Sequence, residues 1–182
     1  MPEIIIRPAT ESDVSILINI DHSFRAHYVW QMDLAPGDGQ ININFREIRL
    51  PRPVSVEYPR QPKNLLDDWS ESSVLLVGVL EQNVVGYISI SEKKSPTTAW
   101  VTDIAVSPMA RRKGIASALI LAAEDWAKKK NIRRMILEMQ SKNTPAIRMA
   151  LKLGFEFCGY NDHYYSNQDI ALFFAQFIRP VL

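Results

Sequence analysis

The sequence feature that most constrains the fold is a long amphipathic helix between two apolar strands. Residues 99–106 and 135–139 are apolar runs of strand length. Residues 114–130, between them, repeat apolar residues on one helical face and carry charged residues on the others. A strand, a helix and a second strand in one sheet form a right-handed crossover with parallel strands. The sequence therefore predicts a parallel βαβ unit at the centre of a sheet.

Shorter strands on both sides of this unit predict antiparallel hairpins. Residues 74–80 and 84–91 are apolar and are separated by a tight turn at 81–83. A second turn is expected over 93–97 because it contains Pro96. The other predicted elements are a strand at 4–6, a helix at 11–24 with Thr10 as its N-cap, a helix at 144–153, and strands at 155–159 and 170–177. The predicted fold class is α/β, with a mixed, mostly antiparallel sheet and a central parallel pair.

Residues 28–70 are predicted to form an extended arm or hairpin on a single domain that spans residues 1–182. Prolines are concentrated between residues 36 and 62, which disfavours a helix. Alternation of apolar and polar residues indicates strands at Ile41, Ile43 and Phe45, and, after a turn at Pro51 and Pro53, at Val54 and Val56. The region has no core of its own, so it is not expected to be a second domain.

Composition excludes several classes of protein. Lys and Arg number 21 and Asp and Glu 20, so the net charge of +1 creates no global attraction to nucleic acid or anionic membranes. The basic residues Lys128–Lys130 and Arg133–Arg134 lie at the C-terminal end of the predicted central helix, where cations are favoured, and are expected to be solvated. The single cysteine, Cys158, is expected to be buried filler in a reducing compartment. No apolar run is long enough for a signal peptide or a membrane span, so a cytoplasmic location is expected.

The turn before the predicted central helix is suited to binding a phosphate. Three basic residues and Gly114 follow the strand that ends at Val106. The first N–H groups of a helix have no internal partners and carry partial positive charge, and a glycine lets a ligand approach the backbone. The segment matches neither the Walker loop nor the Rossmann fingerprint. A glycine at a helix start beside solvated arginines is the alternative interpretation of this segment alone.

Two motifs follow one another on the predicted elements. The first reads Arg111-x-x-Gly114-x-Ala116, after a strand and Pro108. The second reads Asn143-x-x-Ala146, then Leu153-Gly154-Phe155. In residues, order and distance they resemble the acetyl-CoA signature and the second motif of the GNAT superfamily of N-acetyltransferases. The resemblance covers residues 73–178 well and residues 4–24 loosely, and it does not extend to residues 28–70. It implies an enzyme that transfers an acetyl group from acetyl-CoA to a primary amine in a ternary complex.

The resemblance also implies which residues hold acetyl-CoA. The pyrophosphate would lie on the turn and helix start made by Arg111, Arg112, Lys113, Gly114, Ile115, Ala116 and Ser117. The backbone of Ile104 and Val106 would pair with the pantetheine arm. The thioester would enter where a bulge splays this strand from its parallel neighbour, and amides there would hold the oxyanion. Asn143 would hydrogen-bond the arm, and it is also a candidate N-cap before Thr144 and Pro145.

One position departs from the family pattern. Many members carry a tyrosine that protonates the departing thiolate, and this chain has Ala150 there. Positioning and the oxyanion site could suffice without an acid. Otherwise Tyr160, Tyr164 or Tyr165 substitutes, and Tyr164 is the preferred candidate. Each of these tyrosines could instead only pack the last hairpin.

Two carboxylates are candidates for accepting the proton of the acceptor ammonium. Asp103 and Glu138 stand in otherwise apolar strands, where a carboxylate is costly unless it is paired or hydrated. Hydrogen bonding near a strand end is the alternative role for each. His22, His27 and His163 have no metal-ligand spacing, so no metal is expected.

The identity of the acceptor is left open. The segments 103–107, 137–140 and 143–146 resemble streptothricin acetyltransferases, whereas 162–165 and 169–172 resemble protein N-terminal acetyltransferases. A regulatory module that binds acetyl-CoA without efficient transfer is the alternative function. The arm at 28–70 is expected to be ordered by its aromatic residues and to restrict which amine enters; packing against a second copy, in a homodimer, is the alternative.

Overall fold

The computed structural model describes residues 3–58, 64–92 and 97–179. Its main sheet has seven strands in the order β1-β4-β5-β6-β7-β9-β8, and a separate two-stranded sheet is formed by β2 and β3. The strands of the main sheet are β1 (Ile4–Pro8), β4 (Val74–Leu80), β5 (Asn83–Ser91), β6 (Thr98–Val106), β7 (Arg134–Gln140), β8 (Glu156–Asn161) and β9 (Ala171–Phe177). Only β6 and β7 pair in parallel, so the predicted mixed, mostly antiparallel sheet is confirmed.

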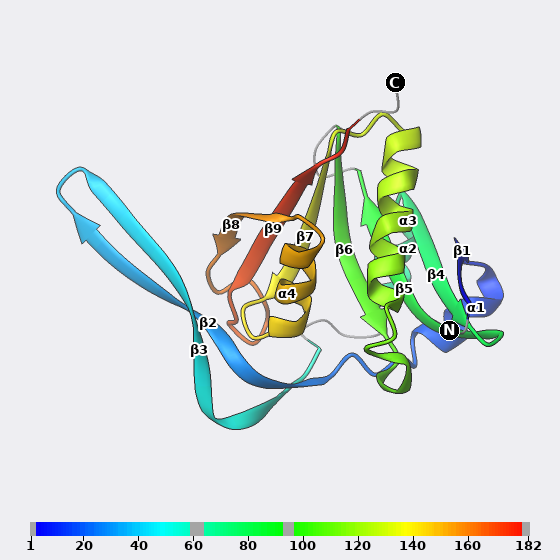
Figure 1. Ribbon diagram of the computed structural model, residues 1–182, viewed down its shortest axis with the longest axis horizontal. Coiled ribbons are helices and arrows are strands. Elements are labelled where there is room, and N and C mark those ends of the chain that lie inside the picture. Colours follow the sequence, from blue (N-terminus) through cyan, green and yellow to red (C-terminus); the bar gives the residue numbers. More distant parts are fainter. Residues whose placement is uncertain (1–2, 59–63, 93–96, 180–182) are drawn as a thin grey trace.

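Helices cover both faces of the sheet (Figure 1). They are α1 (Glu11–Leu17), α2 (Asn64–Ser70), α3 (Ile115–Lys129) and α4 (Thr144–Lys152), with a short 3-10 turn at Pro108–Ala110. The larger core lies under α3 and α4 and includes Ile88, Leu119 and Leu137. The smaller core on the other face joins Leu17 of α1 to Tyr87 and Ala105. Helix α3 connects β6 to β7, as the predicted crossover requires.

The parallel strands β6 and β7 separate toward their carboxyl ends (Figure 1). Their pairing runs only from Thr98 opposite Arg134 to Val101 opposite Leu137. On the other side of β6, Ser89 and Ile90 of β5 pair with Asp103 and Val101, so one extra residue is accommodated in β6 at this point. Such a bulge bends a strand and increases its twist. The expected splay of the central pair is therefore present.

Strands β2 (Phe24–Gly37) and β3 (Gln40–Val56) form a long antiparallel hairpin that projects from the main sheet (Figure 1). The expected arm is thus a hairpin whose strands are longer than predicted, and the prediction that it stays extended to residue 70 is wrong, because Asn64–Ser70 form helix α2. The predicted turn at Pro51 and Pro53 is wrong, because both prolines lie within β3. They stand opposite a register shift between Ala26 and Tyr28, where a residue without an N–H interrupts no regular ladder. That residues 1–182 form one domain stays a prediction.

Two other predictions need correction. The first helix ends at Leu17 rather than at residue 24. Its continuation is replaced by a side-chain turn, in which the Ser23 N–H donates to Asp21 Oδ1 at 2.8 Å. Cys158 is exposed rather than buried, because β8 is the edge of the sheet and its pairing shifts register at this residue. The expected turn at 93–97 lies mostly outside the described residues.

Candidate active site

The start of α3 has the geometry of a phosphate-binding turn. Gly114 is its N-cap in the left-handed conformation, with φ 86°, and Arg112 before it has φ 66°. A Cβ built on Gly114 would meet nothing within 4 Å, so the turn is open to a ligand. The first regular helical bond runs from the Ala118 N–H to the Gly114 carbonyl at 3.0 Å. The N–H groups of Ile115, Ala116 and Ser117 precede this bond and are available to an anion.

The basic residues of this turn do not share one role. Arg112 and Lys113 are exposed and can lend charge to a bound phosphate. Arg111 instead donates to three backbone carbonyls: Val106 at 2.9 Å, Ser23 at 2.8 Å and Asp21 at 2.7 Å. The Arg111 side chain is therefore engaged by protein carbonyls, and its part in holding the pyrophosphate stays a prediction. Its guanidinium fixes the segment between α1 and β2 to the end of β6.

The second motif places Asn143 at the start of α4. Its Oδ1 accepts a 3.2 Å hydrogen bond from the Ala146 N–H, so the expected N-cap is confirmed. Its Nδ2 has no partner among the described residues and remains available to a ligand. Ala150, the position that departs from the family pattern, is fully buried in the main core. An alanine side chain has no proton to donate, and its surroundings in the core exclude water. A general acid for the departing thiolate must therefore come from another element.

Glu138 and Tyr164 are brought together. Glu138 Oε2 accepts 3.1 Å hydrogen bonds from the Tyr164 hydroxyl and from Trp100 Nε1. Tyr164 comes from the β8–β9 connection, and its ring packs edge-on against Phe173 of β9. Glu138 and Phe173 are paired across β7 and β9 and therefore share a face of the sheet. Strand β7 has lost its pairing with β6 at Glu138, so the carboxylate stands at the splay.

Asp103 lies in a second cluster on β6. Its Oδ2 accepts a 2.6 Å hydrogen bond from the Tyr58 hydroxyl and a short one from the Tyr87 hydroxyl. His22 Nε2 lies 2.8 Å from the Tyr87 oxygen, and its ring stacks on Tyr58 with centroids 4.2 Å apart. Asp103 is therefore not a free base, although its Oδ1 has no partner in the described part of the chain.

Burial sets the titration of this cluster. Tyr87 is fully buried. Desolvation, helped by the negative charge of Asp103, raises its pKa far above the usual range, so its hydroxyl stays protonated and donates. Desolvation lowers the pKa of His22, and Asp103 opposes this only in part. The sequence did not identify His22, Tyr58 and Tyr87 as members of this cluster. The one available signal was weak: Tyr87 has a polar hydroxyl in an otherwise apolar strand.

Asp103 and Glu138 lie on one face of the sheet. Asp103 pairs with Ser89, and Trp100, which reaches Glu138, pairs with Ser91. Directly paired residues share a face, and so do residues two apart along a strand. This is the face opposite α3, because Ile88 and Ile90, which alternate with these serines, pack under that helix. The first turns of α3 and α4 therefore lie on one face of the sheet at the splay, and the carboxylates of Asp103 and Glu138 lie on the other.

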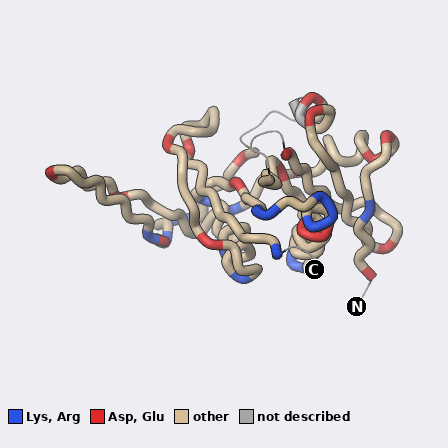
Figure 2. The backbone as a smooth tube through the Cα atoms, turned by 90° about the horizontal axis from the view of Figure 1, so that it is seen from above, with Lys and Arg blue, Asp and Glu red and all other residues tan. Residues whose placement is uncertain are grey.

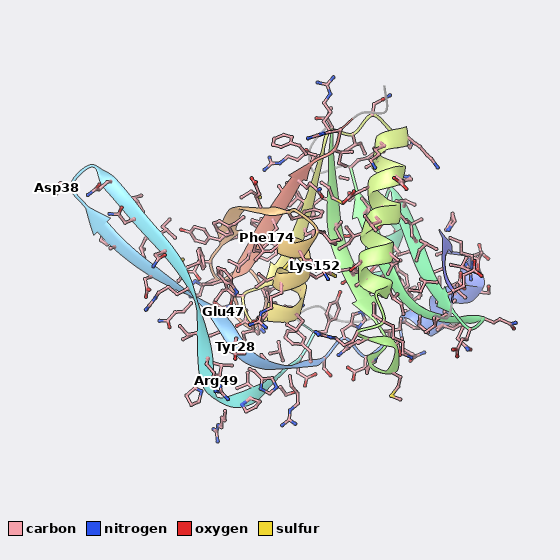
Figure 3. All side chains as sticks on the ribbon, in the orientation of Figure 1. Tyr28, Asp38, Glu47, Arg49, Lys152 and Phe174 are labelled. Atoms are coloured by element: carbon pink, nitrogen blue, oxygen red, sulfur yellow. The ribbon has the colours of Figure 1, made fainter. Side chains whose placement is uncertain are left out.

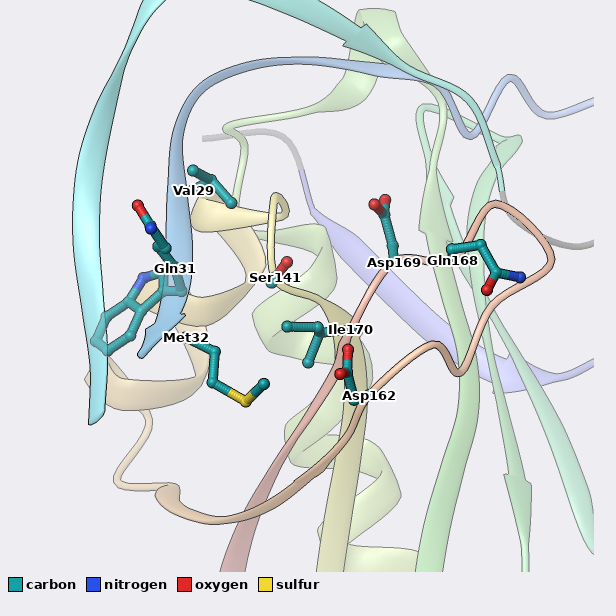
Figure 4. A pocket seen from close by; sticks show the side chains of 9 residues that line it. Val29, Gln31, Met32, Ser141, Asp162, Gln168, Asp169 and Ile170 are labelled. Atoms are coloured by element: carbon teal, nitrogen blue, oxygen red, sulfur yellow. The ribbon is translucent and has the colours of Figure 1, made fainter. Parts of the chain in front are cut away.

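A cavity lies between the root of the hairpin and the β8–β9 connection (Figure 4). Its volume is about 330 Å³. The lining residues are Val29, Trp30, Gln31, Met32, Ser141, Asp162, Gln168, Asp169 and Ile170. Lys142 Nζ lies 2.5 Å from Asp169 Oδ1, whereas the basic group beside Asp162 is the His163 ring, whose Nδ1 lies 3.1 Å from Asp162 Oδ2. Ser141 follows the end of β7, three residues beyond Glu138, so its backbone lies roughly 10 Å from the backbone of Glu138.

Charged residues of both signs are interspersed along the chain (Figure 2). Within the described ranges, no group of three or more His, Cys, Asp or Glu residues could hold a metal ion. None of the helices in the part of the chain that the structure describes is long and apolar enough to cross a bilayer.

Known proteins resemble this chain in sequence and in structure. The model of the acetyltransferase (GNAT) family matches residues 43–155. A streptothricin acetyltransferase of Streptomyces lavendulae is 27% identical over 165 residues, which cover 87% of this chain and 85% of that protein. An N-alpha-acetyltransferase of Sulfurisphaera tokodaii is 32% identical over 114 residues, or 57% of this chain and 68% of that protein.

The fold is shared with solved structures of such enzymes. A nourseothricin acetyltransferase superimposes with a TM-score of 0.83 at 23% sequence identity, covering 97% of this chain and 99% of that one. The family match covers more than half of the chain and includes the turn at Gly114, the β6–β7 splay and Asn143. The chain therefore belongs to the acetyltransferase (GNAT) family and is an acetyl-CoA-dependent N-acetyltransferase.

Proposed function

We propose that the protein acetylates a primary amine on a small cationic molecule of the streptothricin type. The observation that carries this proposal is Glu138 at the splay, held by Trp100 and Tyr164. A carboxylate at this point can attract an ammonium and then take its proton. The likeness to streptothricin acetyltransferases extends over most of the chain, whereas the likeness to the N-alpha-acetyltransferase covers 57% of it.

Acetyl-CoA supplies the acetyl thioester, and the chain's residues hold it from the face of α3. In this proposal the N–H groups from Arg112 to Ser117 surround the pyrophosphate, with Arg112 and Lys113 adding charge. The unpaired edge of β6 at Ile104 and Val106 pairs with the pantetheine arm. Asn143 Nδ2 donates to the same arm. The open turn at Gly114 fits such a ligand because a side chain there would occupy its space.

The amine reaches the thioester from the opposite face, where Glu138 and Asp103 lie. Glu138 takes a proton from the ammonium, directly or through one water, and the neutral nitrogen forms a bond to the acetyl carbon. As the carbon–sulfur bond breaks, the Tyr164 hydroxyl gives its proton to the thiolate. Glu138, 3.1 Å from that hydroxyl, returns the first proton to Tyr164, and the nitrogen, now bonded to the acetyl carbon, releases its second proton to water. The pair thus replaces the acid that is missing at Ala150.

Asp103 acts differently in this proposal. Tyr58 and Tyr87 fix its Oδ2, so the free Oδ1 positions the cationic acceptor without removing its proton. The rest of the acceptor extends past the end of β7 into the cavity beside Asp162, Met32 and Trp30. A lining that combines carboxylates with apolar residues suits a cationic molecule with an apolar stem. The hairpin root therefore forms one wall of the acceptor site. We also propose that the protein acts in the cytoplasm.

A thiol-release assay with acetyl-CoA tests this function. The acceptors to compare are a streptothricin, polyamines, an aminoglycoside and peptides with free N-termini. Rapid release with the streptothricin and slow release with the peptides is the expected result. A preference for peptides would support the N-terminal acceptor instead. Binding of acetyl-CoA with no release above hydrolysis for any acceptor would support the regulatory module.

A further inference from the structure

Tyr164 lies in the connection between β8 and β9, residues 162–170, which contains no helix or strand. Its hydroxyl nevertheless reaches Glu138 of β7, 26 residues earlier in the chain. Phe174, labelled in Figure 3, packs in the main core, so the adjacent Phe173 faces the other side of β9 and meets the Tyr164 ring edge-on there. This ring contact orients the side chain, whereas the position of its backbone depends on the rest of the connection.

The backbone of this connection is strained at two points. His163, directly before Tyr164, has φ 52°, and Gln168, directly before Asp169, has φ 65°. Neither residue is a glycine, so the left-handed conformation costs free energy at each position. Such a conformation persists only where surrounding contacts hold it in place. Asp169 supplies contacts of this kind through its backbone and its side chain.

The Asp169 residue closes the connection on itself. Its carbonyl accepts hydrogen bonds from the N–H groups of Tyr164 at 3.2 Å and Tyr165 at 3.3 Å. Its N–H donates to Asn167 Oδ1 at 3.1 Å, and Asn167 Nδ2 donates to its Oδ2, also at 3.1 Å. The Gln168 N–H donates to the Tyr165 carbonyl at 2.8 Å. The position of the Tyr164 backbone therefore depends on the position of Asp169.

The carboxylate of Asp169 fixes the closed connection to the end of β7. Lys142 Nζ lies 2.5 Å from Oδ1, and Oδ2 accepts a 3.2 Å hydrogen bond from Gln140 Nε2. The Asp169 side chain is only 11% exposed, and a hydrogen bond between charged groups is stronger than a neutral one. Gln140 ends β7, two residues after Glu138. One carboxylate thus joins the backbone that carries Tyr164 to the strand that carries Glu138.

Asp169 also contributes to the wall of the acceptor cavity (Figure 4). Its two carboxylate oxygens, however, already accept from three protein donors, on Lys142, Gln140 and Asn167. A carboxylate that a lysine neutralises in this way has little remaining attraction for a cationic acceptor. The geometry therefore favours a role in holding the connection over a role in contacting the acceptor.

We propose that Asp169, through its ion pair with Lys142, is a positioning residue of the transfer reaction. It holds the β8–β9 connection at the distance from β7 at which the Tyr164 hydroxyl meets Glu138. A displacement of a reacting group by about 1 Å can lower a rate by about a hundredfold, so a looser connection slows the transfer of the Tyr164 proton to the departing thiolate. This proposal rests on the proposed role of Tyr164 as the acid.

Steady-state kinetics of Asp169→Asn test the role. This change keeps the size of the side chain and removes the charge that attracts Lys142. We expect kcat to fall about tenfold, with the acceptor KM and the acetyl-CoA dissociation constant changed by less than about twofold. Asp125→Asn is the matched control, because it removes the carboxylate of a 3.0 Å ion pair with Lys128 on α3, and it should leave kcat unchanged. A raised acceptor KM at unchanged kcat would assign Asp169 to acceptor binding and overturn the proposal.

Two lysine variants test the ion pair itself. Lys142→Arg retains a cation for Asp169 and should keep kcat near that of the wild type, whereas Lys142→Met should lower kcat as Asp169→Asn does. Equal kcat values for the two lysine variants would reject the ion pair as the source of the effect.

A double-mutant cycle with Tyr164→Phe distinguishes positioning from structural damage. In the Tyr164→Phe background, Asp169→Asn should lower kcat little further, because the hydroxyl that Asp169 positions is absent. A loss of kcat by the same factor in both backgrounds would overturn the positioning role and leave Tyr164 as the acid. A Tyr164→Phe variant as fast as the wild type would reject the acid itself, and the positioning role with it.

Amide hydrogen exchange observes the connection directly. The N–H groups of Tyr164 and Tyr165 donate to the Asp169 carbonyl and should exchange faster in Asp169→Asn, whereas the N–H of Phe173, within the main sheet, should not change. Unchanged exchange at Tyr164 would overturn the proposal even if kcat falls.

Discussion

The hydroxyl of Tyr58 donates a 2.6 Å hydrogen bond to the carboxylate of Asp103, 45 residues away along the chain. This contact joins the segment that follows the hairpin to the strand beside the splay. The hairpin root is held at a second point, where the Trp30 N–H donates to the Ser141 carbonyl at 2.9 Å. The arm is therefore fixed on both sides of the proposed acceptor site.

Tyr58→Phe should weaken acceptor binding. A hydrogen bond to a charged group contributes about 1.5–3 kcal/mol, so we expect the acceptor KM to rise about tenfold or more. The acetyl-CoA dissociation constant should be unchanged. Tyr160→Phe is the matched control, because Tyr160 packs on Phe45 through its ring, which phenylalanine retains. Equal effects of the two changes on acceptor KM would show that the Tyr58 contact is not specific to the site.

Gly114→Val should abolish tight binding of acetyl-CoA. The β-branched side chain would be strained at φ 86° and would enter the space assigned to the pyrophosphate. We expect the dissociation constant from calorimetry to rise at least tenfold. Gly39→Val imposes similar strain at φ 70° in open space at the hairpin tip and should leave this constant unchanged. Unchanged affinity in a folded Gly114→Val variant would reject the phosphate site.

Arg111 and Arg112 should respond differently to alanine substitution. Arg111→Ala leaves three carbonyls without their donor, so we expect the free energy of unfolding to fall by about 2 kcal/mol. Arg112→Ala should leave stability unchanged and weaken acetyl-CoA binding, with a larger effect at low salt. Thermal unfolding and calorimetry separate the two. If Arg112→Ala binds acetyl-CoA as the wild type does at every salt concentration, its exposed charge does not contact the phosphate.

Glu138→Gln and Tyr164→Phe should each lower kcat, by about 10² or more. Because the two groups exchange one proton, the double variant should lose little more than the worse single variant. The rate of Glu138→Gln should recover in part at high pH, where more of the acceptor amine is neutral. Losses that simply multiply, or a pH–rate profile that overlays the wild type's, would remove the pair from the proposed mechanism.

Acid should destabilise the N-terminal segment through Asp13. Hydrogen bonds from Arg7, at 2.6 and 2.9 Å, and from Thr10 hold the pKa of the buried Asp13 carboxyl far below its usual range. The resulting stability is present above the unfolded pKa of about 4 and is lost as pH falls below it. Asp13→Asn should lower the free energy of unfolding by about 2 kcal/mol at neutral pH and flatten its dependence below pH ~4. If the free energy of unfolding of Asp13→Asn falls with pH as steeply as that of the wild type, other carboxylates cause the loss of stability in acid.

The sequence by itself determined most of the local elements and the position of the candidate cofactor turn. Apolar periodicity located the strands and α3, because each of these patterns is contained within one segment. The parallel crossover followed from the order of β6, α3 and β7 along the chain. The turn at Gly114 could be located in the same way, because it depends only on a glycine at a helix start. The capping role of Asn143 depends only on Ala146, three residues away.

Only the tertiary structure decided which side chains meet. Arg111 belongs to the phosphate motif by spacing, yet its guanidinium is taken by carbonyls of Asp21 and Ser23, about 90 residues earlier. Tyr58 and Tyr87 join Asp103, and Tyr164 joins Glu138, through contacts between distant segments. Such contacts depend on strand order, on the bulge in β6 and on the return path of the hairpin. No periodicity within a segment encodes these features, because they arise from packing between segments.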